Sequence, residues 1–169
     1  QITINPSGDL AEQTEYYVQI ASTAFDDASS NYYAGISDKT TYSFTTADET
    51  APTIAITSGA SSLKAGETTT VTFTLSEAAT DFIEDDISVT GGSLSSFSGS
   101  GTTYTATFTP TADSTTNGVI SVASSKFSDA AGNENADGSE SNNTLTLSVD
   151  TVRPTIAITS DASSLKAGE

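Results

Sequence analysis

The amino-acid sequence contains a long internal repeat. Residues 153–169 (RPTIAITSDASSLKAGE) differ from residues 51–67 (APTIAITSGASSLKAGE) at only two positions, so the sequence starts again after 102 residues. Solenoid repeats have periods of about 20 to 50 residues, whereas a period near 100 residues is the size of one complete small domain. The repeat therefore predicts a tandem array of small domains, in which length, spacing and stiffness are candidate functions.

A second correspondence defines the expected domain boundaries. Residues 3–31 run parallel to residues 107–133, and the matched pairs are Phe25 with Phe127, Asp27 with Asp129, and Asn31 with Asn133. We therefore expect three parts: the C-terminal part of a preceding domain (1–47), one complete domain (48–150) and the start of the next repeat (151–169).

Composition excludes several classes of function. The chain has 22 acidic and 5 basic residues, a net charge of -17, and no His or Cys. Such a charge repels nucleic acid, and no apolar run approaches the ~18 residues that span a bilayer, so we expect neither a nucleic-acid partner nor direct membrane insertion. Without His or Cys there is no Ser-His or Cys-His pair and no usual zinc site, so we expect no enzyme.

The apolar residues alternate with Thr and Ser. Val71, Phe73 and Leu75 follow this period of two, and the segments around residues 104–108 and 145–149 repeat it. Such alternation is typical of half-buried strands in antiparallel sheets. Seven strands are expected, separated by Gly-rich or Asn-Gly turns: 53–57 with a short edge piece near Leu63, 69–76, 87–90, 94–97, 102–109, 119–123 and 144–149. The prediction is an all-β, seven-stranded immunoglobulin-like β-sandwich in tandem repeat.

Several motifs in a fixed order resemble one family. The PTIAITSGASSLKAGE segment, the later KFSDAAGNENADG segment and the VDTVRPT linker are similar to the bacterial immunoglobulin-like domains of large repetitive surface adhesins. The resemblance implies a non-enzymatic extender or stalk in a secreted or cell-surface protein. It also implies calcium at or near the joints between domains.

The topology of such a sandwich indicates a calcium site independently. The linker before the first strand, the loop after residue 76 and the loop after residue 123 all lie at one pole, where their acidic side chains would repel one another unless a cation bound. Carboxylate and amide oxygens are the ligands that Ca²⁺ takes. The candidate ligands are Asp48, Glu77, Asp85, Asp86, Asp129 and Asn133. The alternative is that these acids form a solvated loop surface.

The expected partners are neighbouring repeats in the same chain. Short linkers containing Pro52 and Pro154 favour a defined angle between domains, although proline also starts edge strands. Calcium at each joint would turn a string of domains into a rod. Two other functions stay open: a subunit of an extracellular fibre that contacts other copies, and a carbohydrate- or surface-binding module that uses Tyr32 and Tyr33.

Overall fold

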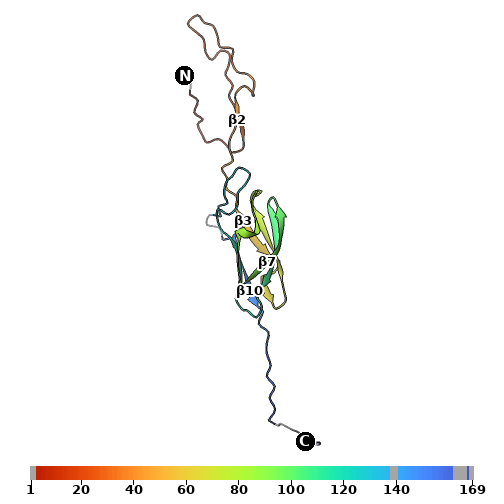
Figure 1. Cartoon of the computed structure of the whole chain (residues 1–169). Coiled ribbons are helices and arrows are strands. Elements are labelled where there is room, and N and C mark those ends of the chain that lie inside the picture. Colours follow the sequence, from red (N-terminus) through yellow and green to blue (C-terminus); the bar gives the residue numbers. More distant parts are fainter. Residues whose placement is uncertain (1–2, 138–140, 162–166, 168–169) are drawn as a thin grey trace.

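Three parts of the chain follow one another along its length. The computed structural model describes residues 3–137, 141–161 and 167. A front unit (residues 3–47) is followed by a central domain (residues 48–150) and an extended C-terminal segment (Figure 1). Within the described residues, no helix has the length and apolarity needed to cross a membrane.

The central domain is a sandwich of two four-stranded sheets. One sheet has the order β3-β5-β8-β7, and the other has the order β4-β10-β9-β6. The strands are β3 (Ile54–Ser58), β4 (Ser62–Lys64), β5 (Thr69–Leu75), β6 (Ile87–Thr90), β7 (Gly92–Ser100), β8 (Thr103–Pro110), β9 (Gly118–Val122) and β10 (Thr144–Asp150). All neighbouring pairs are antiparallel except β4 with β10, which are parallel.

Alternation along the strands builds the core between the sheets. In β5, residues 69, 71, 73 and 75 are buried, while the threonines at 70 and 74 are exposed. Phe82 lies near the middle of an aromatic cluster in which its ring centroid is 5.1 Å from those of Tyr104 and Phe127. Period-two burial of this kind stabilises a sandwich without the disulfide that many such domains contain, since the chain has no Cys.

Two glycines make room for one phenylalanine in this core. Phe108 is fully buried, and its ring lies against Gly92 at the start of β7 and Gly118 at the start of β9. A Cβ atom at Gly118 would lie 2.4 Å from Cζ of Phe108. These positions therefore require glycine for packing.

The front unit has little regular structure. Its strands β1 (Glu15–Tyr17) and β2 (Ser43–Thr45) form a short antiparallel pair, and Tyr16 stacks on Phe44 with centroids 5.9 Å apart. Large apolar side chains on this unit are exposed, among them Tyr32 and Tyr42 at 65% each. The unit presents an apolar surface that its own described residues do not cover.

The structure confirms an all-β sandwich but differs in detail from the prediction. The edge piece near Leu63 is a strand in its own right, β4, so the described residues of the central domain form eight strands and not seven. The strand expected at 94–97 extends over Gly92–Ser100, because Gly99 adopts a φ of 147° and continues the pairing that the glycines were expected to end. The described residues beyond Asp150 contain no strand, so the tandem repeat stays a sequence observation.

Candidate metal centre

Asp129 is held in a tight loop between β9 and β10. Its Oδ1 accepts hydrogen bonds from the backbone N–H groups of Ala131 and Asn133, at 2.8 and 2.9 Å, and its Oδ2 accepts one from the Asn133 side chain at 2.8 Å. In the front unit, Asp27 makes the same three contacts with Ser29 and Asn31. The loop geometry thus follows the sequence correspondence between these two segments.

Asp48 lies in the linker, where it contacts both the front unit and the central domain. Its Oδ2 accepts a hydrogen bond from Nε2 of Gln13 at 2.7 Å, and its Oδ1 accepts one from the N–H of Thr50 at 3.1 Å. The side chain of Asn133 donates to the backbone carbonyl of Asp48 at 3.2 Å. The linker is therefore held from both sides, and the Asp48 carboxylate is oriented toward the pole of the central domain.

Three carboxylates converge at this pole. Glu77 follows the end of β5, and one carboxylate oxygen from each of Asp48, Glu77 and Asp129 lies within 4.8 Å of the others. Asp129 is buried, and the other two side chains are half-buried. We call this group the acidic triad.

The pKa values reflect this crowding. Burial and then the charges of Asp48, Asp129 and Glu12 raise the pKa of Glu77. Burial by itself would raise the pKa of Asp129, but hydrogen bonds from the Asn133 side chain and from nearby backbone N–H groups outweigh it and lower that pKa. The fold thus favours the ionised form of Asp129 and disfavours the ionised form of Glu77.

The geometry of the triad fits a hard cation. Two oxygens that each lie ~2.3–2.6 Å from one Ca²⁺ can be at most about 5 Å apart. The carboxylate oxygens of the triad, which lie within 4.8 Å of one another, satisfy this limit. The donors are carboxylates, and hydrogen bonds from Gln13 to Asp48 and from Ala131 to Asp129 fix the orientation of these side chains, as hydrogen bonds to the ligands of a metal do. The residues present therefore fit calcium, with the remaining positions open to backbone oxygens or water.

Not every predicted ligand reaches the triad. Asp85 and Asp86 lie in the short 3₁₀ turn η1 (Glu84–Asp86), where the Asp86 carboxylate accepts a hydrogen bond from the N–H of Ile83 at 2.9 Å. Asn133 donates its amide N–H to Asp129 and Asp48, so it positions these residues. Asp48, Glu77 and Asp129 are the three candidates that the structure brings together.

Sequence reasoning missed Glu12 of the front unit. Its Oε2 accepts hydrogen bonds from Oγ1 of Thr50 at 2.7 Å and from the N–H of Glu49 at 3.3 Å, and its charge contributes to the raised pKa of Glu77. Residues 3–31 are two residues longer than the matching segment 107–133, but this difference does not single out Glu12. No sequence signal indicated that this loop of the front unit reaches the linker.

Together, a two-sheet sandwich with this strand order and an acidic pole at the entry of the chain define an immunoglobulin-like module. A family model described as a bacterial Ig-like domain matches residues 48–146, and another with the same description matches residues 1–46. The chain belongs to the bacterial Ig-like domain family, whose members are typical of surface proteins. Comparisons with curated proteins and with solved structures gave no match.

Proposed function

We propose that this chain is a non-catalytic extender of a secreted or cell-surface bacterial adhesin, whose tandem Ig-like repeats are made rigid by calcium. The observation that carries the proposal is the acidic triad at the joint between the front unit and the central domain. One member, Asp48, belongs to the linker itself. A cation bound there would tie the linker to two loops of the central domain.

Glu12 extends the site across the joint. Its carboxylate comes from the front unit, contacts the linker at Thr50 and is near enough to Glu77 to raise its pKa. Without a cation, four negative charges repel at the point where the two parts meet. With Ca²⁺ bound, the same charges attract the ion and oppose bending, so calcium would act on joint angle as well as on domain stability.

The exposed surface of the front unit supports the proposed domain boundaries. Phe25 is 42% exposed, whereas its counterpart Phe127 in the central domain is 2% exposed and packs on Phe82. The difference is explained if residues 1–47 are the C-terminal part of a domain whose other sheet would cover Phe25. Residues 48–150 then form one complete repeat, and residues 151–169 begin another.

Small-angle X-ray scattering tests the proposal. The maximum dimension of the chain should be longer and better defined in millimolar Ca²⁺ than in chelator, and Mg²⁺ should have a smaller effect because it demands a tighter octahedral site. Glu12→Gln should reduce the response, whereas Glu15→Gln, an exposed change on β1, should leave it intact. Equal dimensions in Ca²⁺ and chelator would overturn the proposal.

A further inference from the structure

In both the front unit and the central domain, a threonine just after the last strand forms hydrogen bonds with an earlier loop of the same unit. In the front unit, the N–H of Thr46 donates to the carbonyl of Thr14 at 3.1 Å, its Oγ1 donates to the carbonyl of Ala11 at 2.6 Å, and the N–H of Thr14 donates back to Oγ1 at 3.0 Å. We call this arrangement the threonine clamp. It marks the point at which the chain leaves a unit.

The same clamp recurs at the end of the central domain. Thr151 donates its N–H to the carbonyl of Ser114 at 2.9 Å and its Oγ1 to the carbonyl of Thr111 at 2.7 Å, and the N–H of Ser114 donates to Oγ1 at 2.9 Å. The clamp makes Thr151 the structural counterpart of Thr46. Thr111 and Ser114 are likewise the counterparts of Ala11 and Thr14.

The residue two positions after the clamp threonine has opposite charges in the two units. Asp48 is two residues after Thr46, and Arg153 is two residues after Thr151. On the loop side, Glu12 follows Ala11 directly, whereas the residue that follows Thr111 is Ala112. Counted from the clamp, Arg153 therefore stands in the place of Asp48, and Ala112 stands in the place of Glu12. The linker keeps one carboxylate, Asp150, which is four residues before Pro154 as Asp48 is before Pro52, and whose Oδ1 accepts a hydrogen bond from the N–H of Val152 as that of Asp48 does from Thr50. The second joint thus differs from the first by the added guanidinium and by the missing counterpart of Glu12.

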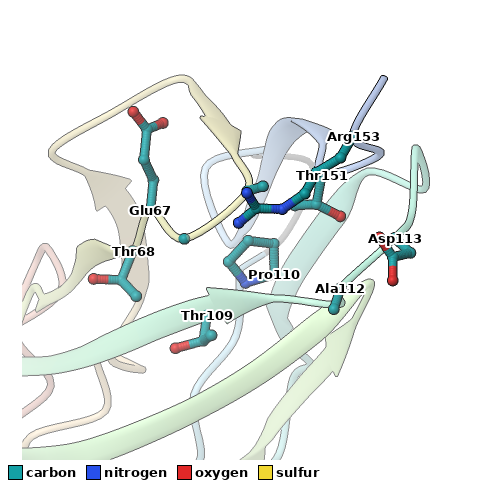
Figure 2. Close-up of a pocket in the computed structure, with 10 residues that line it drawn as sticks. Glu67, Thr68, Thr109, Pro110, Ala112, Asp113, Thr151 and Arg153 are labelled. Atoms are coloured by element: carbon teal, nitrogen blue, oxygen red, sulfur yellow. The ribbon is translucent and has the colours of Figure 1, made fainter. Parts of the chain in front are cut away.

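Arg153 lies at the lower pole of the central domain, formed by residues 65–68, 110–116 and 150–153. Figure 2 shows its guanidinium extending across Pro110 toward the turn that carries Glu67. Arg153 and Asp113 both line a hollow of about 340 Å³ at this pole. Among the described residues, Arg153 forms no salt bridge within 4.0 Å. Its charge is available to a partner at this pole.

We infer that this lower pole receives the acidic pole of a second copy of the Ig-like module, and that Arg153 there supplies the positive charge that calcium supplies at the first joint. The second copy is indicated by residues 153–169, which repeat the start of the central domain. The inference rests on the proposed function, because the first joint is its reference. The acidic residues of the module are opposite in charge to Arg153. Through the equivalent loop, the front unit contacts Asp48 and Thr50 of the linker that enters the central domain.

The linker lengths indicate that the following module lies closer to the clamp threonine at the second joint than at the first. Pro52 is six residues after its clamp threonine, whereas Pro154 is three residues after Thr151. Three residues span at most about 10 Å. The acidic pole of the following module can therefore lie up to about 10 Å nearer to the preceding unit at the second joint than at the first. A short linker leaves less room for hydrated ions and favours a direct contact with Arg153.

The test uses the chain extended in register, with residues 68–152 added after Glu169 so that the module begun at Arg153 is completed. Because the chain has no Cys, pairs of introduced cysteines can carry fluorophores across the first joint or across the second. In chelator, the second joint should keep a narrow distance distribution, whereas the first should broaden. Arg153→Gln should make the second joint broaden in chelator, and Arg153→Lys should largely retain the narrow distribution.

Salt separates a charge effect from a packing effect, because exposed ion pairs weaken as the Debye length falls to about 3 Å at 1 M salt. The second joint should therefore broaden in chelator when the salt is raised to about 1 M. A chelator-treated second joint that is equally narrow in the parent and in Arg153→Gln would overturn the inference. A first joint that ignores Ca²⁺ would instead refute the calcium proposal, and the two failures are read from different label pairs.

Discussion

Replacing Glu77 by Gln should have opposite effects on stability with and without calcium. The folded protein raises the pKa of Glu77 because burial and the neighbouring charges of Asp48, Asp129 and Glu12 disfavour its ionised form. In chelator, an uncharged amide removes that repulsion, so Glu77→Gln should raise the melting temperature of the central domain. In Ca²⁺, the same change removes a ligand and should lower it.

The size of the calcium effect follows from the donor set. A site with three carboxylates and further oxygens from water or backbone is comparable to extracellular calcium modules, with dissociation constants of ~10⁻⁴ to ~10⁻³ M. At ~10 mM Ca²⁺, mass action then stabilises the parent by about 1.4–2.7 kcal/mol. For a domain of about 100 residues this raises Tm by about 7–13 °C. A tenfold loss of affinity in the variant would reduce the gain to about 0.4–1.4 kcal/mol.

Differential scanning calorimetry in ~10 mM Ca²⁺, in ~10 mM Mg²⁺ and in chelator measures both effects. Glu84→Gln is the matched control, because Glu84 lies in the same loop, is exposed and is outside the triad. It should change Tm little under any of the three conditions. The reasoning is refuted if the parent shows no calcium-selective rise, or if Glu77→Gln lowers Tm equally in Ca²⁺ and in chelator.

Three further predictions concern pH and packing. Because the pKa of Glu77 is raised in the folded state, protonated Glu77 stabilises the fold. In calcium-free buffer this contribution to the free energy of unfolding is complete below the unfolded-state pKa of about 4.3 and is lost as pH rises through the folded-state pKa. Tm should therefore rise as the pH is lowered between these two pKa values, and it should rise by more than in Glu77→Gln. Gly118→Ala should destabilise the domain by about 1–3 kcal/mol in urea unfolding, because the new Cβ meets the buried ring of Phe108. Asp137→Ala should cost about 1–3 kcal/mol in the same assay, because the buried carboxylate accepts a 2.8 Å hydrogen bond from the N–H of Ile54.

Each of these predictions has a control and a contrary outcome. The pH effect is wrong if the parent and Glu77→Gln titrate alike in calcium-free buffer. Gly8→Ala, at a site where a Cβ meets no atom within 4 Å, should leave the urea midpoint unchanged, and an equal loss at Gly118 and Gly8 would contradict the packing argument. For Asp137, the exposed Glu84→Ala serves as control, and matching midpoints in the two variants would show that the buried hydrogen bond is not needed.

Much of the fold was predictable because burial alternates along single strands. The period of two around Val71, Phe73 and Leu75 indicated which faces pack together, and the structure buries all three. The pairing between strands that are distant in the sequence was harder to predict. The three-residue β4 has one buried apolar side chain, Leu63, and is recognised as a strand only because it pairs in parallel with β10. The glycines of β7 resemble turn signals, yet the left-handed φ of Gly99 allows the strand to continue.

The candidate site was predictable only in part, because its residues come from separate segments. Strand order places Asp48, Glu77 and Asp129 at one pole without any knowledge of loop shape. The direction of a side chain in the η1 turn depends on local backbone hydrogen bonds, so Asp85 could not be assigned from order alone. Glu12 lies in another unit, and its approach depends on how two units meet.

The parallel pairing of β4 with β10 determines how the central domain would carry load. The chain enters the central domain before β3, at the end that faces the front unit, and leaves it after β10 at the opposite end (Figure 1). Tension between these ends pulls β4 and β10 in opposite directions along their length, so the bonds that join residues 62–64 to residues 148–150 are strained together rather than one after another. Single-molecule pulling should show one abrupt rupture per domain, and a gradual extension would contradict this view. A module of this kind would keep its length under tension up to a threshold force. Each domain that unfolded would then lengthen the chain and lower the tension on its neighbours.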